Sequence, residues 1–426
     1  MDTLRERISY IRERFAPRSS TADEVREFME RSFRRFPWRI IVSDWRGDTY
    51  VVGQNQPHFC GKPLHMVLET EAAGRDLLRL DGMRFLERFL AGEVDFRGNL
   101  YALASISRHA SFQVKPWHLA ARALELIAFQ DVSRAQVSVK SHYDVPQAAL
   151  DVYLDRRYKS YSCGIFEAPH DLNIADCLRI GQGREDDWDS LEKAQWRKFK
   201  DAIDYIAPEP QETVLDIGCG YGGQLEVALE RYPVRKIVGW THSHNQAREG
   251  RERLASFDPA IWELNEGDYR QEKRVFDHVT STGMVSHVGP RGLVPYVKNV
   301  RKRIKKGGRY LHHALMTAHS RLPLDWSVGI AFNKKYVWPG FHWFTVGEHV
   351  RALEQNGFQI DRLVNLTFHY AKTTTAWYER MMANEALMRE HLGAETFRAW
   401  QVFLAGITGA YLNRDVHVYR LYCVAV

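Results

Sequence analysis

The second half of the chain alternates short apolar runs of strand length with longer amphipathic stretches. The short runs predict strands at 214–217, 236–240, 275–281, 310–315, 359–366 and 416–426. The amphipathic spacing predicts helices at 224–231, 246–255, 294–304 and 346–355, and a helical stretch that continues to about residue 410. Such alternation specifies an α/β fold with a doubly wound, mainly parallel sheet. Ligands bind these sheets at the carboxyl ends of the strands, where Gly218, Thr241 and Ser281 fall.

The first 130 residues follow a different pattern, which predicts a smaller α+β domain. Residues 1–35 have a helical pattern rich in Arg and Glu, and 38–43 and 49–52 are strand-like runs joined by a hairpin at 44–48. A third strand is expected at 63–69, followed by two short helices up to about residue 108. A helical segment at 116–129 and a polar stretch at 131–140 then lead onward. We therefore place the N-terminal domain at 1–130 and the α/β domain at 131–426.

Composition and charge restrict the cellular compartment and the partners that we expect for the protein. No stretch approaches the roughly 18 apolar residues of a membrane span, and the Arg-rich N-terminus lacks a secretory apolar core, so we expect a cytoplasmic protein. Five scattered cysteines without a C-x-x-C pair favour a reducing compartment and argue against structural zinc, so no metal site is expected. A net charge of +6 favours attraction to an anionic surface, either membrane phospholipid or nucleic acid.

The segment 213–223 carries the most specific chemical signal in the chain. Two apolar residues lead into Asp216, and Gly218, Gly220 and Gly222 then crowd the turn before a helix. Glycines let the backbone approach a ligand closely, and the helix N-terminus behind them offers free N–H groups. Many strand-to-helix turns need glycine for conformation alone, so the pattern by itself leaves an ordinary turn open. No Gly-Lys-Ser/Thr follows, which argues against a nucleotide triphosphatase.

The acid before the glycines resembles motif I of methyltransferases that use S-adenosylmethionine (SAM), and further segments resemble one family of them. The chain is similar to the cyclopropane-fatty-acid synthases and their mycolic-acid methyltransferase relatives at 142–144, 161–163, 215–223, 238–246, 283–290, 369–370, 376–380 and 409–410. The resemblance implies a seven-stranded class I SAM methyltransferase sheet. The part around 87–95 is similar to the smaller lipid-associated domain of that family.

The same resemblance assigns residues to the cofactor. Thr241 stands where many such folds place a carboxylate on the ribose, with Ser243 and Gln246 behind it, and Asp268 and Tyr269 fall where the family contacts the adenine. Tyr161 and Ser162 resemble the segment that closes over the methionine end. With the motif I residues, the expected cofactor-binding set is Tyr161, Ser162, Asp216, Gly218, Gly220, Gly222, Thr241, Ser243, Gln246, Asp268 and Tyr269.

The family reaction implies a second set of residues. An alkene attacks the SAM methyl group, and the faces of Tyr370, Trp377 or Tyr378 could stabilise the carbocation that forms. A base must then remove a proton. In the family, bound bicarbonate does this near the residues that match Cys163, His313, Leu315 and Tyr370. The neighbouring His312 leaves the choice of histidine open, and Cys163 could equally be a small buried apolar residue.

Two positions depart from the family pattern. Where the family usually reads Met-Phe-Glu-His-Val-Gly, this chain has Ser286, and the missing Glu normally orients the bicarbonate. Ser286 can hydrogen-bond an anion, but it cannot accept a proton as a carboxylate does. Ile407 replaces a cysteine that relatives often carry, which excludes thiol chemistry there. The predicted catalytic set is Cys163, Ser286, His313, Leu315 and Tyr370, with His313 and Tyr370 as the best pair to replace the missing base.

These observations favour SAM-dependent transfer of a one-carbon group to the double bond of an unsaturated fatty acyl chain in a phospholipid, giving a cyclopropane. Two alternatives stay open: a methyl- or methylene-branched product, and a lipid-binding partner protein with impaired turnover. We expect peripheral association with the anionic inner membrane face, with the basic run 301–306 as a candidate contact, and no nucleic acid partner. The aromatic stretch 338–344 is either an acyl entrance or a packed loop, and a homodimer is an open alternative.

Overall fold

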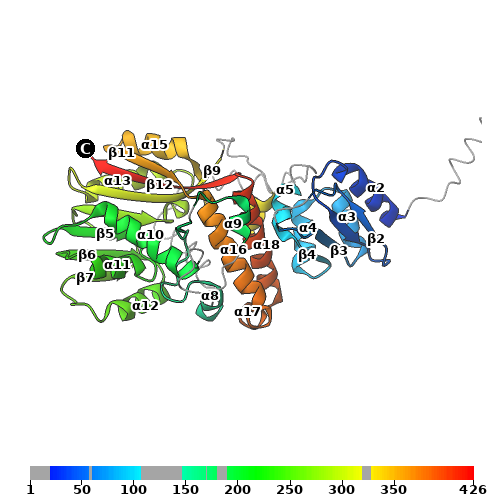
Figure 1. Cartoon of the computed structure of the whole chain (residues 1–426), viewed down its shortest axis with the longest axis horizontal. Helices are drawn as coiled ribbons and strands as arrows, with labels where there is room; N and C mark the ends of the chain where they lie inside the picture. Colours follow the sequence, from blue (N-terminus) through cyan, green and yellow to red (C-terminus); the bar gives the residue numbers. More distant parts are fainter. Residues whose placement is uncertain (1–19, 57–59, 107–145, 169, 180–189, 319–327) are drawn as a thin grey trace, which may run out of the picture. The chain divides into compact units, whose positions relative to one another are not determined.

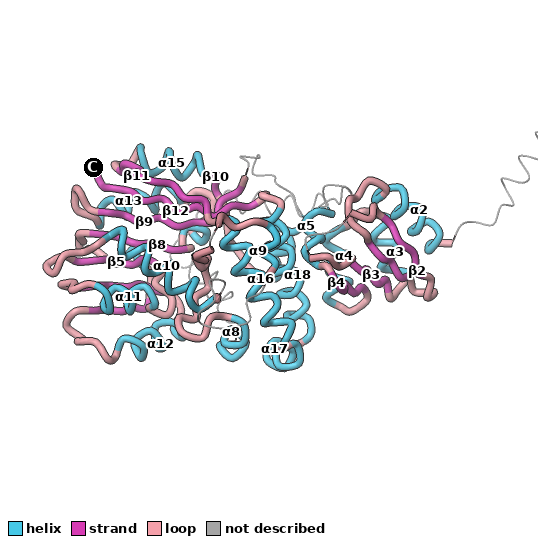
Figure 2. Tube along the Cα trace, viewed as in Figure 1, coloured by secondary structure: helices cyan, strands magenta, loops and turns pink. Residues whose placement is uncertain are grey.

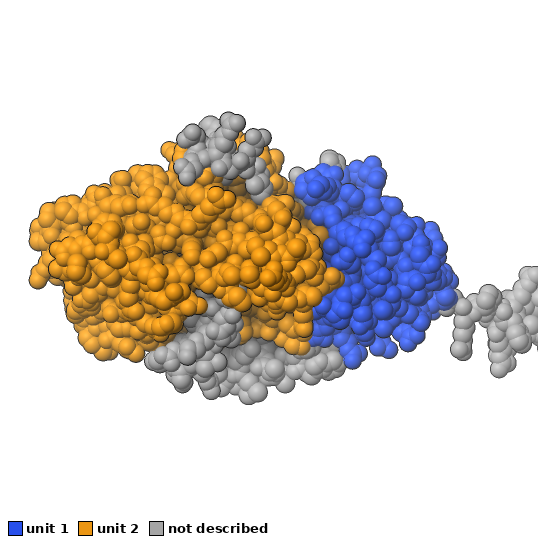
Figure 3. Space-filling model, turned by 90° about the horizontal axis from the view of Figure 1, so that it is seen from below, with its two compact units in different colours: residues 1–99, 108–113 blue, residues 100–107, 114–426 orange. Residues whose placement is uncertain are grey.

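The computed structural model describes residues 20–56, 60–106, 146–168, 170–179, 190–318 and 328–426. These residues form two compact units, one within 1–99 and 108–113 and the other within 100–107 and 114–426 (Figures 1 and 3). The expected domain boundary near residue 130, the helical segment 116–129 and the polar stretch 131–140 lie outside the described residues. The boundary therefore stays a prediction.

The first unit is built on a four-stranded sheet in the order β2-β1-β3-β4. Its strands are β1 (Ile40–Ser43), β2 (Thr49–Val52), β3 (Leu64–Leu68) and β4 (Val94–Gly98), and its helices are α2 (Thr21–Phe33), α3 (Glu71–Leu78) and α4 (Gly82–Leu90). The antiparallel β1–β2 pair confirms the predicted hairpin. Only two short helices were expected between residue 69 and about residue 108, and β4, which pairs antiparallel with β3, was not predicted. Two exposed residues at its end and the flanking glycines concealed the strand.

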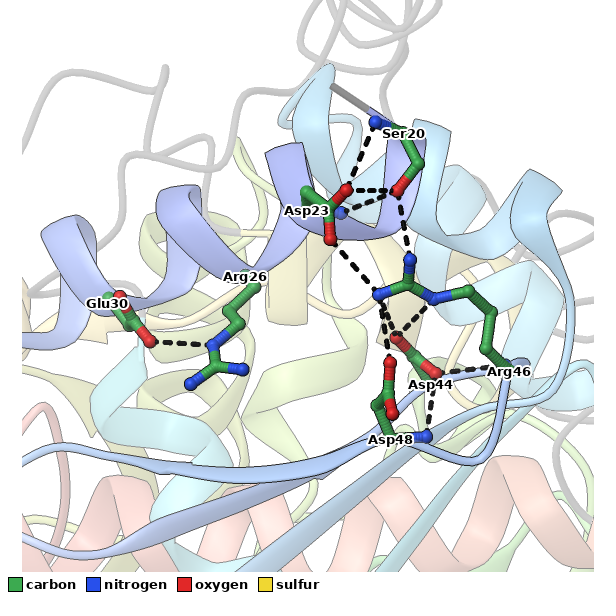
Figure 4. A network of polar contacts seen from close by, with 7 residues as sticks. All are labelled: Ser20, Asp23, Arg26, Glu30, Asp44, Arg46 and Asp48. Atoms are coloured by element: carbon green, nitrogen blue, oxygen red, sulfur yellow. Dashed lines mark hydrogen bonds and ion pairs between the residues drawn. The ribbon is translucent and has the colours of Figure 1, made fainter. Parts of the chain in front are cut away.

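A polar network fixes the hairpin to the start of α2 (Figure 4). The buried carboxylate of Asp44 accepts hydrogen bonds from the backbone amides of Arg46 at 2.9 Å and Asp48 at 3.1 Å, which closes the turn. Arg46 then reaches back to Ser20 at 3.0 Å and Asp23 at 3.2 Å, the two residues that form the capping box of α2. Charge and capping together thus join two elements that are distant in sequence.

The second unit contains a sheet whose path is β11-β12-β9-β8-β5-β6-β7, with β10 paired to β9. The strands are β5 (Thr213–Ile217), β6 (Lys236–Thr241), β7 (Trp262–Glu266), β8 (His278–Thr282), β9 (Arg309–Thr317), β10 (Phe344–Thr345), β11 (Phe358–Asn365) and β12 (Val416–Ala425). All pairs are parallel except those of β12 with β9 and β11. This confirms the doubly wound, mainly parallel sheet with seven strands on its main path. The short β10 is an addition.

Helices pack around this sheet (Figure 2), and two apolar cores join them to its strands. The helices around it are α10 (Leu191–Ile206), α11 (Gly223–Arg231), α12 (His244–Leu254), α13 (Leu293–Arg303) and α15 (Val346–Glu354). One core joins α10, α11 and α12 to the strands through residues such as Ile203, Leu225 and Ala247. The other joins α13 and α15 through residues such as Val297 and Leu353. Because both faces are covered, central strands such as β5 and β9 are mainly apolar and do not alternate between apolar and polar residues.

Two strands of this unit were not predicted or were placed imprecisely. β7 contains only Trp262 and Leu264 as apolar residues and lies at the sheet edge, so its composition resembles a loop. β8 begins at His278 rather than at residue 275, because Phe276 makes only an isolated bridge to Ile304.

The remaining elements are helices that contact one another, together with two single turns that follow β7 and β8. They are η1 (Leu100–Ala102), α5 (Leu103–Ile106), α8 (Gln147–Tyr153), α9 (Ile174–Leu178), η2 (Tyr269–Gln271), η3 (Val285–His287), α14 (Val328–Tyr336), α16 (Thr367–Ala383), α17 (Glu385–Leu392) and α18 (Ala394–Leu412). The long helices α16 and α18 pack side by side (Figure 1). Among the described residues, no helix is long and apolar enough to cross a bilayer, and no group of side chains has the make-up of a metal site.

Candidate functional site

The second unit contains a cavity of about 360 Å³ at the carboxyl ends of β5, β6, β8 and β9. It brings together all five residues of the predicted catalytic set: Cys163, Ser286, His313, Leu315 and Tyr370. Eight of the predicted cofactor residues also line it: Tyr161, Ser162, Asp216, Gly218, Gly220, Thr241, Gln246 and Tyr269. Gly222, Ser243 and Asp268 do not line it. Segments spread over 250 residues therefore converge on one space.

The glycine loop after β5 is shaped to leave room for a ligand. Gly218, Gly220 and Gly222 all have positive φ, at 82°, 56° and 76°. A Cβ on Gly220 would meet no heavy atom within 4 Å, whereas one on Gly218 would lie 3.0 Å from Met284. The amides of Gly218 and Cys219 donate to the carbonyl of Trp240, at 3.0 and 2.9 Å. The loop is thus tied to β6 and leaves open space at Gly220.

Asp216 lies under this loop as a buried acid. Its carboxylate accepts a hydrogen bond from Thr280 Oγ1 at 2.8 Å, and its side chain lines the cavity. Burial raises the pKa of Asp216 to about 7, although the Thr280 hydrogen bond and the charge of Lys198 act in the opposite direction. Asp216 is therefore positioned by the neighbouring strand β8.

At the end of β6 the predicted ribose residues take two different places. Thr241 Oγ1 donates to Gln246 Oε1 at 2.7 Å, and both side chains are buried and line the cavity. Ser243 is the N-cap of α12 and accepts from the amide of Gln246. Ser243 therefore holds the helix that presents Gln246. This follows the usual preference for serine at a helix start.

Of the two residues expected to contact the adenine, only Tyr269 lines the cavity. Arg270, which the sequence analysis did not select, lines it as well. The carboxylate of Asp268 is fully buried and is held by Arg270 through its backbone amide at 2.8 Å and its Nε and Nη2 atoms at 2.9 and 2.5 Å. Asp268 therefore holds the side chain of Arg270 in place instead of lining the cavity itself.

A buried lysine supports the segment that carries Tyr161 and Ser162. Lys198 of α10 donates to Ser160 Oγ, to Ser162 Oγ at 2.8 Å and to Gln195 Oε1 at 2.6 Å. Burial lowers its pKa to about 7. The sequence analysis missed Lys198 because a lysine in an amphipathic helix is usually exposed.

Four stacked rings form one wall of the cavity. His287 stacks on Trp338 with ring centroids 5.5 Å apart, Trp338 on Tyr161 at 5.6 Å, and Tyr161 on Trp377 at 4.9 Å. All four rings line the cavity, and they come from four different segments. The aromatic stretch 338–344 therefore contributes to the cavity rather than forming a separate packed loop.

The three aromatic residues expected near a carbocation are not equivalent. Tyr370 and Trp377 line the cavity and meet edge to face, with ring centroids 5.9 Å apart. Tyr378 does not line it and packs instead against Tyr101. Successive residues of α16 point in different directions, so only one of the adjacent rings Trp377 and Tyr378 can face the same space.

The neighbouring histidines are separated by the sheet. His313 lines the cavity, whereas His312 points to the opposite face and forms hydrogen bonds with Tyr310 at 2.7 Å and His349 at 2.9 Å. Alternation along β9 produces this separation. Cys163 is fully buried, and burial raises the pKa of its thiol to about 12, which excludes a thiolate at neutral pH.

Several buried polar atoms that line the cavity have no hydrogen-bond partner among the described residues. Ser286 Oγ is one, and its residue is only 3% exposed. The others include Gln224 Nε2, Thr282 Oγ1 and Asn299 Oδ1. Buried polar groups are normally satisfied, so each of these atoms has capacity for one further hydrogen bond, to water or to a polar ligand. The position of Gln224 directly after the glycine loop was a signal that sequence reasoning could have used.

The lining residues fall into a polar group and an apolar group. The polar group comes from the carboxyl ends of β5 and β6 and the segments that follow them, and it includes the open glycine loop, Thr241 and Gln246. The aromatic and apolar group comes from the stretch 338–343 and from α18, with Trp338, Phe341, Trp343, Phe403, Leu404, Ile407 and Tyr411 among its residues. His313 of β9 and Tyr370 of α16 line the same cavity. Polar groups suited to SAM and apolar groups suited to a hydrocarbon chain are therefore present in one cavity.

Known sequences match this chain over most of its second unit. The family described as mycolic acid cyclopropane synthetase matches residues 130–421. The cyclopropane-fatty-acyl-phospholipid synthase of Escherichia coli (strain K12) is 28% identical over 296 residues, which cover 70% of this chain and 70% of that protein. The sphingolipid C9-methyltransferase A of Emericella nidulans is 27% identical over 333 residues, which cover 75% of this chain and 60% of that protein.

Solved structures show the same fold. The cyclopropane synthase MmaA2 from Mycobacterium tuberculosis superposes with a TM-score of 0.60 at 24% identity, covering 68% of this chain and 98% of that one. The mycolic acid cyclopropane synthase CmaA1, complexed with SAH and CTAB, gives a TM-score of 0.59 at 22% identity, with the same coverage. At these identities the likeness concerns the fold.

Proposed function

This chain belongs to the mycolic acid cyclopropane synthetase family and is a SAM-dependent methyltransferase, and on that premise we propose that it acts on the double bond of an unsaturated fatty acyl chain to form a cyclopropane. The observation that carries the proposal is the mixed lining of the cavity. A glycine loop with hydroxyl and amide groups and a set of aromatic rings line the same space, and Tyr161 stacks on Trp377 within it.

The cofactor end has a specific division of labour. SAM supplies an electrophilic methyl group on a cationic sulfonium. The backbone at Gly218 and Gly220 allows close approach, and Thr241 and Gln246 offer hydroxyl and amide groups to the ribose. Tyr161 and Ser162, braced by Lys198, cover the methionine end. Each of these assignments follows the family pattern at a residue that lines the cavity.

The acyl end binds a long apolar chain and protects a cation. The rings of Tyr370 and Trp377 present faces and edges to the cavity, and the face of an aromatic ring attracts positive charge. Both rings are buried, at 6% and 1% exposure, so little water reaches a cation beside them. The aromatic wall therefore both binds the chain and stabilises the charge that develops on it.

Proton removal is assigned to a small bound anion rather than to a side chain. His313 and Tyr370 are donors on the cavity wall and would hold bicarbonate, with the backbone near Cys163 and Leu315. Ser286 stands where the family pattern has a carboxylate, and its unpaired hydroxyl can donate to the same anion. The donor set fits an anion, and Asp216 is the one carboxylic acid among the described residues that line the cavity.

An enzyme that modifies fatty acyl chains must reach its lipid substrate at a membrane. We propose an unsaturated fatty acyl phospholipid as substrate and reversible association of a cytoplasmic protein with the inner membrane face. The basic run Arg301–Lys306 lies at the opposite edge of the sheet from the cavity, before the start of β9. Arg301 and Arg303 donate to the carbonyls of Val426 and Lys273, and Lys305 pairs with Asp277 at 2.6 Å. Another surface is therefore favoured for membrane contact.

A second product is supported by one observation. Ser286 cannot orient a bound base as a glutamate can, so the carbocation could live longer than ring closure requires. It could then lose a proton from a neighbouring chain carbon, which leaves a methyl-branched alkene. Alternatively, a hydride shift could move the cation to the methylated carbon, and loss of a proton from the new methyl group would leave a methylene branch. The fatty acid methyltransferase named among the relatives, from Pseudomonas putida, is 28% identical over 295 residues.

The test is mass spectrometry of total fatty acids after expression in a host that lacks its own cyclopropane synthase. We expect unsaturated chains to gain one methylene unit, and catalytic hydrogenation then separates ring from branch. The Gly220→Val variant serves as the inactive control. A protein that binds SAM and lipid but yields no modified chain would contradict the proposal and favour the lipid-binding alternative.

A further inference from the structure

A buried arginine lies directly beside the cavity histidine. Arg420 of β12 pairs in register with His313 of the antiparallel strand β9, so the two side chains leave the same face of the sheet. The Nε atom of Arg420 donates to His313 Nδ1 at 3.2 Å. Their residues are 0% and 2% exposed, so water does not compete for this contact.

Helix α10 fixes the arginine from the other side. Arg420 Nη1 donates to Asp201 Oδ2 at 2.5 Å and to the carbonyl of Lys198 at 3.2 Å. Tyr422 donates to the same Asp201 oxygen at 2.5 Å. The guanidinium is therefore held by a helix and a strand at once, and its Nε–H has a defined direction.

The hydrogen bond between Arg420 and His313 defines which nitrogen of the His313 ring carries the proton. A guanidinium can only donate, so His313 Nδ1 must carry a lone pair. A neutral imidazole with a bare Nδ1 carries its proton on Nε2. The ring of His313 lines the cavity, and its remaining ring nitrogen is therefore a donor.

We infer that Arg420 is a positioning residue that holds His313 as the neutral tautomer with its proton on Nε2, so that His313 serves the cavity as a hydrogen-bond donor and not as a base. This rests on the proposed function only for the identity of the acceptor. It corrects the expectation that His313 could replace the missing base, since Nδ1 is occupied by Arg420 and Nε2 already carries a proton.

The surrounding charges oppose protonation of His313. Burial lowers its pKa well below the usual value, and the charges of Arg420 and Lys198, with His312 on the same strand, act in the same direction. The groups that face the pair are Lys198 and Asp201 from α10, His369 from α16 and Cys163 from the preceding loop. Asp201 is the one carboxylate among these four groups, and it accepts hydrogen bonds from both Arg420 and Tyr422.

The tautomer is read directly by nitrogen NMR of histidine-labelled full-length protein without substrate, with His313→Gln used to assign the signal. We expect His313 to show a protonated Nε2, a bare Nδ1 and no titration between pH 5.5 and 8. In Arg420→Met, which removes both donor and charge, we expect a mixture of tautomers and a titration that moves toward the ordinary histidine pKa of about 6.5. Arg420→Gln, which keeps a neutral amide donor, and Lys200→Met on the exposed side of α10 are the matched controls.

The pH dependence of kcat/KM is a second readout, and it would not change if Arg420 had only a structural role. In Arg420→Met, kcat/KM should acquire an acid limb that falls roughly tenfold per pH unit below the restored pKa, while the wild type and Lys200→Met should lack this limb. A wild-type His313 that is protonated on Nδ1, or charged at neutral pH, would overturn the inference even if no variant folds. An inactive protein with the expected tautomer would overturn the proposed function alone.

Discussion

Gly220→Val is the substitution that best separates ligand binding from folding. Gly220 has φ +56°, and a Cβ built on it meets no heavy atom of the protein within 4 Å. The cost to folding is therefore mainly that of a left-handed backbone for a side chain, about 1–2 kcal/mol. Its side chain would enter the cavity where the loop backbone is expected to meet SAM.

The expected loss of affinity follows from the same geometry. Forcing a side chain into a well-packed contact typically costs about 1–3 kcal/mol, which corresponds to roughly 5- to 150-fold weaker SAM binding. The matched control is Gly307→Val, because Gly307 also has a positive φ, of +81°, and open space around its Cβ, but lies outside the cavity. Both variants should lose similar thermal stability.

The assay is isothermal titration calorimetry with SAM, alongside thermal unfolding of each variant. We expect weakened binding in Gly220→Val and near wild-type binding in Gly307→Val. A folded Gly220→Val protein with wild-type affinity would refute the assignment of the glycine loop to the cofactor. Equal loss of affinity in both variants would show that backbone strain, rather than the occupied space, is responsible.

Three further predictions address catalysis, stability and location. Ser286→Glu should raise the ratio of cyclopropane to branched product above that of the wild type and of Ser286→Gln, and an unchanged ratio by gas chromatography would remove this position from product choice. Burial lowers the pKa of His312 to about 4 and that of His349 well below its usual value, so the unfolded state binds more protons below pH 6.5. Stability measured by urea unfolding should therefore fall as the pH drops from 6.5 toward 4, and a flat profile over that window would contradict the buried neutral histidines. Neutralising three charges of Arg301–Lys306 should leave sedimentation with anionic vesicles largely intact, since this run lies away from the cavity, and loss of vesicle binding would place the membrane contact there.

Much of the fold of the second unit could be predicted because its strands are buried on both faces. Runs such as 214–217 and 310–315 are mainly apolar, apart from Asp216 and the pair His312 and His313, and such runs are typical of parallel strands under helices. β7 was missed because an edge strand such as Trp262–Glu266 carries polar residues, and β4 because its exposed end looked like a break. The predicted domain boundary near residue 130 falls outside the described residues.

The cavity residues could be found where chemistry is written into a local motif. Gly218, Gly220, Thr241 and Gln246 lie in short patterned segments, and the structure brings them to one cavity. Lys198 and Arg420 could not be found this way, because each looks like an ordinary polar residue of a helix or a strand. Their burial depends on contacts between α10 and β12, which no local pattern encodes.

The sequence motifs also could not predict which of two neighbouring side chains faces the cavity. His312 and His313 were left as alternatives, and the pleat of β9 separates them between the two faces of the sheet. Tyr378 was grouped with Trp377 as a cation-stabilising ring, and the helical turn of α16 directs Tyr378 toward Tyr101 instead. Both differences follow from the period of the element once its register is fixed.

The central claim, one-carbon transfer to an acyl double bond with ring closure, is tested most directly with purified protein, vesicles of unsaturated phospholipid and SAM whose methyl group carries three deuterium atoms. Ring closure removes a proton from the transferred methyl group, so the account predicts a lipid product that retains two of the three deuterium atoms and takes up no hydrogen in catalytic hydrogenation. A methylene-branched product also retains two deuterium atoms, but hydrogenation would saturate it. A product that retains all three would show that the proton leaves the acyl chain and that a branched chain forms. Absence of any labelled lipid, in a protein that binds SAM, would contradict the account.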